Sequence, residues 1–196
     1  MLQARMRHNS ETFALIAVGS NLASQVGSAR ATVRHAFELI SELEGVAEVQ
    51  PSPLYATPAY PPGSGPEFGN ACCALRTELP PETLLQMLHT IEAKLGRVRQ
   101  KRWDARIIDL DLLAYGSEVL PDIATFNCWK ELSAALQQSR APGEIILPHP
   151  RMQDRAFVLV PLNDVTPDWK HPVSGSTVSE MLAALPASSL TGIRRL

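Results

Sequence analysis

Hydrophobic and polar positions recur along the chain with two periods, and these periods mark out strands and helices. Residues 13–18 form a short apolar run that Gly19-Ser20-Asn21 ends, which predicts a buried strand followed by a tight turn. Over residues 28–43 the apolar positions recur at intervals of three and four, as expected for a helix that ends before Gly45. Residues 46–55 alternate loosely and predict a second strand.

A loop separates these elements from the next group. Residues 57–69 contain four prolines and three glycines, so they are not expected to form regular structure. The later segments predict, in chain order, a strand at 70–79, a helix from Pro80 to Gly96, strands at 107–115 and 157–162, and a helix at 176–185.

The order of these elements indicates the fold class. Before residue 116 it reads strand–helix–strand–strand–helix–strand, which is typical of a ferredoxin-like α+β unit. We expect one domain over residues 12–196. Residues 121–143, bracketed by prolines, predict an insertion with a single amphipathic helix, whose apolar positions are Phe126, Trp129, Leu132, Ala135 and Leu136.

Composition narrows the class of protein. The 196 residues include 18 Lys and Arg against 20 Asp and Glu, a net charge of −2, which argues against a general nucleic-acid-coating protein. No apolar run approaches the roughly 18 residues of a membrane-spanning helix. The three cysteines form no CxxC pair, which is typical of a reduced, cytoplasmic protein. We therefore expect a cytoplasmic protein with neither a membrane nor a nucleic-acid partner.

Two acids in an apolar strand are the sharpest chemical feature. Asp109 and Asp111 are flanked by aliphatic residues, and positions i and i+2 of a strand point to the same side. Two neighbouring carboxylates repel each other unless a cation lies between them, and Mg²⁺ is usually bound by one or two carboxylates together with phosphate oxygens. The alternative is a strand whose polar face simply meets solvent.

A basic cluster precedes this acid pair. Its members are Arg97, Arg99, Lys101, Arg102 and Arg106. Arginine suits bidentate contact with phosphate, so the cluster and the acids together predict a magnesium polyphosphate site. A solvated basic loop is one alternative. RNA binding is another, because Trp103 lies within the cluster, although the two acids would repel phosphates in the absence of metal.

Other candidates lie on turns and loops. The backbone N–H groups of Gly19-Ser20-Asn21 could approach a ligand, and His149, held between prolines, could contact phosphate together with Arg155. Each of these features is also typical of an ordinary turn or surface loop. Asn70, near Thr57 and Pro58, offers the donor and acceptor that suit the edge of a heterocyclic ring. The aromatic residues that could enclose such a ring are Phe68, Trp103 and Phe157.

Five segments carry a family resemblance over about residues 13–170. They are Ala17-Val18-Gly19-Ser20-Asn21-Leu22, Tyr55-Ala56-Thr57-Pro58, Glu92 to Arg99, Arg102-Trp103 to Asp111, and Leu147-Pro148-His149-Pro150-Arg151 through Phe157 and Pro161-Leu162. In this order they resemble the 6-hydroxymethyl-7,8-dihydropterin pyrophosphokinase family of folate biosynthesis.

The resemblance implies a fold and a reaction. The fold would be a three-layer α-β-α sandwich around a mainly antiparallel, ferredoxin-like sheet. The reaction would transfer the pyrophosphoryl group of ATP to the hydroxymethyl oxygen of the reduced pterin and release AMP. ATP would be the co-substrate and two Mg²⁺ ions the cofactors, and we expect a monomer whose partners are these small molecules.

The resemblance also implies roles for individual residues. The catalytic set is Arg97, Arg106, Asp109 and Asp111, of which the two acids are the metal ligands. The ATP-binding set is Leu85, Glu92, Arg99, Arg102, Trp103, Arg106, Leu112, His149 and Arg155. The pterin-binding set is Thr57, Pro58, Phe68, Asn70, Trp103 and Phe157.

Three positions depart from the family pattern. Asp104-Ala105 stands where the family usually has Gly-Pro, Phe68 stands where it often has Tyr, and the segment 121–143 is longer than usual. We hypothesise that this insertion covers part of the nucleotide site or meets a partner.

Two alternatives from other functional classes stay open. One is a catalytically silent member whose sheet binds RNA or a protein. The other is a magnesium nucleotidyltransferase that acts on a different acceptor and releases pyrophosphate. The intact pair Asp109 and Asp111, together with Arg97, favours the pyrophosphokinase, because a binding module has no need of these residues.

Overall fold

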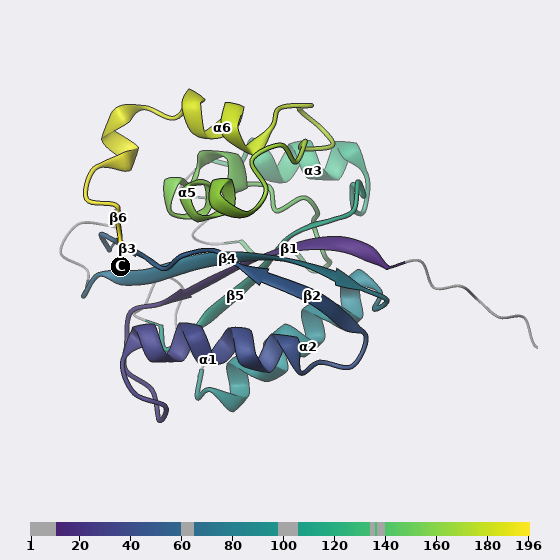
Figure 1. Cartoon of the computed structure of the whole chain (residues 1–196). Helices are drawn as coiled ribbons and strands as arrows, with labels where there is room; N and C mark the ends of the chain where they lie inside the picture. Colours follow the sequence, from purple (N-terminus) through teal and green to yellow (C-terminus); the bar gives the residue numbers. More distant parts are fainter. Residues whose placement is uncertain (1–10, 60–64, 98–105, 134–135, 137–139) are drawn as a thin grey trace, which may run out of the picture.

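A sheet with helices on both of its faces organises the chain (Figure 1). The computed structural model describes residues 11–59, 65–97, 106–133, 136 and 140–196. Within those ranges no helix is both long and apolar enough to cross a membrane. The elements are β1 (Thr12–Ser20), α1 (Ala29–Ser41), β2 (Val46–Pro51), β3 (Tyr55–Thr57), β4 (Phe68–Thr77), α2 (Pro81–Lys94), β5 (Asp109–Tyr115), α3 (Ile123–Lys130), η1 (Met152–Asp154), α5 (Ala156–Val165), α6 (Val178–Ala184), η2 (Ala187–Leu190) and β6 (Arg194–Arg195).

The strands lie in the order β5-β1-β4-β3-β6, and β2 also pairs with β4. All of these pairings are antiparallel. Helices α1 and α2 cover one face of the sheet, while α5 and α6 cover the other (Figure 1). The predicted α+β class, with a ferredoxin-like three-layer sandwich, is therefore confirmed.

Along the central strands, successive side chains point to opposite faces of the sheet, and this builds a core on each face. On β4, Cys73 and Leu75 pack toward α1 and α2, whereas Cys72 and Ala74 pack toward α5 and α6. Because β4 is covered on both faces, it reads as a nearly continuous apolar run. This double anchoring fixes the strand positions from which the polar side chains at the sheet end project.

The prediction of a strand at 157–162 is wrong, because these residues lie within helix α5. Its buried residues are spaced as one face of a helix: Ala156, Val158, Leu159, Pro161 and Leu162. A short apolar run bounded by polar residues fits a buried helix as well as a buried strand. The helical form packs this run against Leu113 of β5 and Cys72 of β4.

Four predicted boundaries also need correction. β4 begins at Phe68, inside the segment that was expected to be irregular, and ends at Thr77 instead of at residue 79. The strand predicted at 46–55 is two strands, β2 and β3, separated by residues 52–54, where Ser52 bonds to the backbone of Cys72. β1 continues through Gly19 and Ser20, which were expected to form a turn. In the insertion, helix α3 ends at Lys130, so Leu132 lies beyond it and Ala135 lies outside the described residues.

The insertion leaves and rejoins the fold at a single point. Leu120 and Leu147 exchange two backbone hydrogen bonds of 2.8 and 3.1 Å. Immediately after this bridge, the His149 N–H donates to the Leu113 carbonyl on β5 at 2.7 Å. Whatever the conformation of the insertion, the chain that follows it is therefore fixed against the edge strand.

A buried histidine joins the insertion to the segment after α5. His171 is 3% exposed, and its ring lies near those of Phe126 and Trp169, with centroids 5.7 and 6.0 Å away. Its Nδ1 accepts from two backbone N–H groups, and its buried Nε2 has no partner among the described residues. Burial, with a further contribution from Lys130, lowers the pKa of His171 to about 4.

This pKa predicts acid sensitivity of the fold. Between about pH 6.5 and pH 4 the unfolded chain binds a proton at His171 that the folded chain does not, so the free energy of unfolding falls as the pH falls. The contribution to the slope is at most about 1.4 kcal/mol per pH unit. Urea unfolding from pH 7 to pH 4.5 measures it. His171→Asn keeps an acceptor at the Nδ1 position without titrating and should flatten the profile, and an unchanged slope would contradict the assignment.

Candidate active site

β5 presents two carboxylates on the sheet face that bears α5. Asp109 and Asp111 alternate with Leu110 and Leu112, which are buried in the core on the opposite face. The acids are partly exposed, with exposed side-chain fractions of 22% and 39%. The apolar positions thus hold the strand in place, and both carboxylates point to the same side, as predicted from the period of two.

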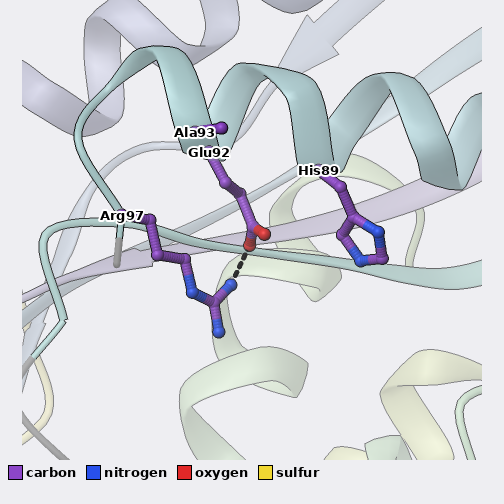
Figure 2. Close-up of a pocket in the computed structure, with 4 residues that line it drawn as sticks. All are labelled: His89, Glu92, Ala93 and Arg97. Carbon is purple, nitrogen blue, oxygen red and sulfur yellow. Dashed lines mark hydrogen bonds and ion pairs between the residues drawn. The ribbon is translucent and has the colours of Figure 1, made fainter. Parts of the chain in front are cut away.

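Glu92 of α2 connects this helix to the acid pair. The side chain is 2% exposed, and its Oε1 accepts the backbone N–H of Leu110 at 2.8 Å. The same carboxylate pairs with the Arg97 guanidinium (Figure 2), which also contacts Asp109 Oδ1 at 2.7 Å. Glu92 therefore satisfies an N–H group of the edge strand and holds Arg97 beside Asp109.

A second arginine reaches Asp109 from the other side. Arg106 pairs with Asp109 Oδ2, and its backbone is held by Asn21, whose side chain accepts the Arg106 N–H at 2.7 Å. Ser20 adds a hydrogen bond to the carbonyl of Ile107 at 2.5 Å. The end of β1, which the sequence suggested as a ligand-facing turn, thus anchors the residues that precede the acids.

A third arginine faces Asp111. Arg155, at the start of α5, places Nη1 3.8 Å from Asp111 Oδ2 and 3.4 Å from His149 Nε2. The N–H of Arg151 donates to His149 Nδ1 at 3.1 Å, so the neutral ring carries its proton on Nε2. His149 and Arg155 therefore present two donors side by side, an arrangement that suits an anionic oxygen.

Burial and charge set the protonation of these groups. Burial, followed by the charge of Arg155, lowers the pKa of His149 to about 3, so the ring is neutral at pH 7. Burial and the neighbouring Asp111 raise the pKa of Asp109, while Arg106 and Arg97 oppose that shift. A pair of acids whose ionisation is opposed in this way gains from a nearby cation.

The acid pair fits a magnesium ion. In the described part of the chain, no group of three or more His, Cys, Asp and Glu side chains could hold a metal. An ion at Asp109 and Asp111 would therefore complete its shell with water and substrate oxygens, which is how Mg²⁺ is usually bound beside phosphates. The donor set is all oxygen and carries the negative charge that a hard divalent cation requires.

A row of paired residues crosses the sheet from Asp109 on β5 to Asn70 on β4. Gly19 of β1 pairs with Asp109 on one side and with Asn70 of β4 on the other. Adjacent strands lie about 4.8 Å apart, so the Asp109 and Asn70 backbones are about 10 Å apart. A Cβ atom at Gly19 would lie only 2.6 Å from Asn70 Oδ1. Glycine therefore leaves this part of the sheet open between the two side chains.

Other predicted residues gather around Asn70. Its Nδ2 donates to Thr57 Oγ1 at 2.7 Å, and both residues are buried. Phe68 lies two positions earlier on the same strand face, whereas Pro58 is exposed directly after β3. Phe157, on α5, is 39% exposed, and the Arg155 guanidinium lies 5.7 Å from the centre of its ring.

A shallow pocket lies along the C-terminal half of α2. Its volume is about 300 Å³, and it is lined by His89, Glu92, Ala93 and Arg97 (Figure 2). Leu85 is partly buried one turn before His89, on the same helix. The Leu112 side chain lies in the core and does not reach this pocket. Arg99, Arg102 and Trp103 lie outside the described residues.

Sequence reasoning missed two residues of this region. Asn21 holds Arg106 through its side chain, and its position directly after the strand in Gly19-Ser20-Asn21 was the available signal. His89 lines the pocket on α2, and its spacing of three from Glu92 places the two on the same helix face. The contact of Asn21 with Arg106 joins residues 85 positions apart, which a single sequence does not show.

Comparison with known proteins identifies the family. A family model described as 7,8-dihydro-6-hydroxymethylpterin-pyrophosphokinase (HPPK) matches residues 15–167. The chain belongs to the HPPK family. This confirms the resemblance drawn from the sequence motifs, and the match spans every segment that carried it.

Relatives over nearly the full length agree with this assignment. The chain is 39% identical over 181 residues to the 2-amino-4-hydroxy-6-hydroxymethyldihydropteridine pyrophosphokinase of Pseudomonas aeruginosa, covering 92% of this chain and 94% of that protein. It is 36% identical over 179 residues to the Methylorubrum extorquens protein of the same name, covering 91% of this chain and 97% of the relative.

Solved structures of this family share the fold. The wild-type HPPK-DHPS of Plasmodium falciparum superposes with a TM-score of 0.62 at 15% sequence identity. The match covers 90% of this chain and 45% of that one, so this HPPK chain spans less than half of the Plasmodium protein. At this identity the comparison supports the three-layer arrangement alone.

We predict that the two contacts of Glu92 can be separated by substitution. Glu92→Gln keeps an acceptor for the Leu110 N–H but loses the charge facing Arg97, and should cost about 1–2 kcal/mol of unfolding free energy. Glu92→Leu loses both contacts and should cost about 3–5 kcal/mol. Urea unfolding measures these changes. Glu118→Leu, at an exposed position, serves as the control, and equal stabilities of the two Glu92 variants would contradict the proposed division.

Proposed function

We propose that pyrophosphoryl transfer takes place on the sheet face that presents Asp109 and Asp111. The observation that carries the proposal is the convergence of three arginines on one pair of acids. Arg97, Arg106 and Arg155 come from three separate segments, and all contact this one pair of carboxylates. Positive charge gathered on two acids fits a polyphosphate bound with a divalent cation better than it fits an inert surface.

Family membership sets the reaction. The chain is an enzyme of folate biosynthesis that transfers the pyrophosphoryl group of ATP to the hydroxymethyl group of 6-hydroxymethyl-7,8-dihydropterin. The products are the pterin diphosphate and AMP. We therefore favour this reaction over the two alternatives, a silent binding module and a nucleotidyltransferase that releases pyrophosphate.

Asp109 and Asp111 are the proposed metal ligands, and we assign them two Mg²⁺ ions. When bound, magnesium would neutralise phosphate charge and polarise the acceptor hydroxyl. The half-buried positions of the two acids and the raised pKa of Asp109 support this assignment. With magnesium on the acids, Arg97 and Arg106 would be free to donate to phosphate oxygens instead of to Asp109.

The nucleotide is proposed to lie between α2 and the start of α5. Arg155 and His149 Nε2–H donate to phosphate oxygens, because both already point to the same space beside Asp111. The pocket lined by His89 and Glu92 takes the ribose and base, with Leu85 beside it. Further ATP contacts are assigned to Arg99, Arg102, Trp103 and the backbone of Leu112.

The pterin is proposed to lie at the other end of the residue row. Asn70 and Thr57 face the polar edge of the ring, and their mutual hydrogen bond fixes the orientation of both groups. The rings of Phe68, Phe157 and Trp103 enclose its faces, and Pro58 lines the entrance. The gap of about 10 Å between Asn70 and Asp109 leaves room for the pterin and its hydroxymethyl arm.

The chemical step needs alignment more than a strong base. The hydroxymethyl oxygen attacks the β-phosphorus and loses its proton to water. The bond from this phosphorus to the oxygen shared with the α-phosphorus breaks, and AMP leaves with that oxygen. His149 does not serve as the base, because its Nε2 carries a proton and its Nδ1 is occupied by the Arg151 N–H. Charge neutralisation by Arg97, Arg106 and Arg155, with the two reactants held in line, supplies the rate enhancement.

The proposal extends to the chain as a whole. Residues 12–196 form one catalytic unit in which the insertion at 121–143 covers part of the nucleotide site. Arg151 supports this, because its guanidinium donates at 3.4 Å to the carbonyl of Lys130, the last residue of α3, and at 3.5 Å to that of Leu132. The net charge of −2 and the free thiols support a cytoplasmic enzyme, which we take to be monomeric, without nucleic-acid or membrane partners.

Product analysis by phosphorus NMR tests the proposed reaction. The chain is mixed with ATP, Mg²⁺ and 6-hydroxymethyl-7,8-dihydropterin, and controls omit the pterin or the metal. AMP and a pterin diphosphate should form only in the complete mixture. Release of pyrophosphate, or unchanged ATP from folded protein, would overturn the proposal.

Asp109→Ala is predicted to lower kcat on the order of a thousandfold, because it removes a metal ligand and the partner of two arginines. Its unfolding free energy should stay within about 1 kcal/mol of wild type, since the substitution also relieves repulsion with Asp111. The exposed Asp168→Ala is the matched control and should keep full activity. Activity of the Asp109 variant near that of Asp168→Ala would refute the metal assignment.

A further inference from the structure

The segment from Gly192 to Leu196 lies along the strand that carries Thr57. β6 pairs with β3 so that Arg195 lies opposite Tyr55 and Arg194 opposite Ala56. The Leu196 N–H continues this pairing by donating to the Leu54 carbonyl at 2.8 Å. In Figure 1 the chain descends from the α5 and α6 layer to reach this edge of the sheet. A short strand from the far end of the sequence therefore borders β3.

Gly192 brings the same segment against Pro58. A Cβ atom at Gly192 would lie 2.7 Å from Cγ and 3.3 Å from Cδ of the Pro58 ring. The residue also has a φ of +81°, in the left-handed region that favours glycine. Any other side chain here would have to displace Pro58 or move its own backbone. The two residues are thus in direct contact, and the position of one sets that of the other.

Arg194 makes a second contact, at the start of β4. Its Nη2 lies 2.6 Å from Glu67 Oε2, and Glu67 directly precedes Phe68. The segment therefore touches the residue that follows β3 and the residue that precedes β4. These are the points where the backbone enters and leaves the part of the sheet that holds Thr57, Phe68 and Asn70.

β3 is held from the α5 side as well. The Tyr55 hydroxyl donates to Asp164 Oδ2 on α5 at 2.6 Å. Because α5 also carries Phe157, this hydrogen bond ties β3 to the helix that bears Phe157. β3 thus has β4 on one edge and β6 on the other, and Tyr55 ties it to α5.

We propose that residues 192–196 are a positioning element for the pterin pocket, acting through Gly192 on Pro58 and through Arg194 on Glu67. The inference rests on the proposed assignment of Thr57, Pro58, Phe68 and Asn70 to the pterin. The segment does not touch the substrate. It sets the separation between the end of β3 and the start of β4, and through it the affinity for the pterin rather than for ATP.

Gly192→Ala, compared with Gly175→Ala, tests this proposal. Both glycines have positive φ, +81° and +74°, so alanine strains the backbone at each. Only Gly192 has a close neighbour, because nothing lies within 4 Å of the Cβ position at Gly175. Displacement by a fraction of an ångström at a binding site should raise the KM for pterin about tenfold. The KM for ATP should stay within about twofold of wild type, and Gly175→Ala should leave both KM values unchanged.

Steady-state kinetics with each substrate varied in turn measures this split, and thermal unfolding shows that each variant is folded. An equal pterin KM in the two glycine variants would overturn the proposal. So would a parallel rise in both KM values for Gly192→Ala, because a general loss of structure affects both substrates.

The ion pair provides a second test that does not depend on the folding of Gly192→Ala. Arg194→Glu faces Glu67 with a like charge and should raise the pterin KM about threefold, as expected for an exposed pair. The exchange of both charges, Glu67→Arg with Arg194→Glu, should restore it. A wild-type pterin KM in Arg194→Glu would contradict the proposed role of Arg194. So would a pterin KM that stays raised when both charges are exchanged.

Thr57→Ala separates this inference from the function on which it rests. If Thr57→Ala raises the pterin KM and Gly192→Ala does not, the pocket assignment stands and the positioning role fails. If neither variant changes the pterin KM while the wild-type chain turns over, the assignment of the pocket itself is wrong.

Discussion

Charge balance at Asp109 is the constraint on which the rest of the site depends. A half-buried carboxylate beside a second one is unfavourable unless positive charge lies close by. Arg97 and Arg106 supply that charge from opposite sides, and each is held by a further residue, Glu92 for the first and Asn21 for the second. Because these holders belong to α2 and to the end of β1, the same balance ties a helix and two strands to one point.

The same arrangement explains how the proposed site accepts a highly charged substrate at little cost. Before ATP binds, the arginines neutralise the acids. In the proposed complex with magnesium and ATP, the acids would pair with the metal and the guanidinium groups with phosphate oxygens, so no charge would be left buried alone. Arg155 and His149 extend this surface. Arg155 adds one positive charge, and the imidazole ring of His149, which is neutral, adds none. On this proposal the charged groups would exchange partners, and the strands and helix that hold them would stay in place.

Prediction from the sequence succeeded where local periodicity decides and failed where tertiary contacts decide. The shared orientation of Asp109 and Asp111 follows from the strand period, so one sequence sufficed. The apolar run 157–162 predicts a strand although it lies in helix α5, because six apolar residues fit both forms. Glu92 accepts the N–H of Leu110, which edge strand β5 leaves without a strand partner. Asn21 accepts the N–H of Arg106, which follows it 85 residues later in the chain. The Glu92 contact has no local signal, and the Asn21 contact has only the place of Asn21 directly after the strand.

The sheet also sets the distance between the two proposed binding sites. Asp109, Gly19, Asn70 and Tyr55 lie opposite one another on four successive strands, so their spacing is fixed by backbone hydrogen bonds and not by loops. Gly19 lacks a side chain at the point where one would strike Asn70, which keeps the span between acid and amide open. The least anchored member of the row is Tyr55, because β3 has only three residues. A short strand needs neighbours on its free edge to hold register, and this requirement is met by β6 from the far end of the chain.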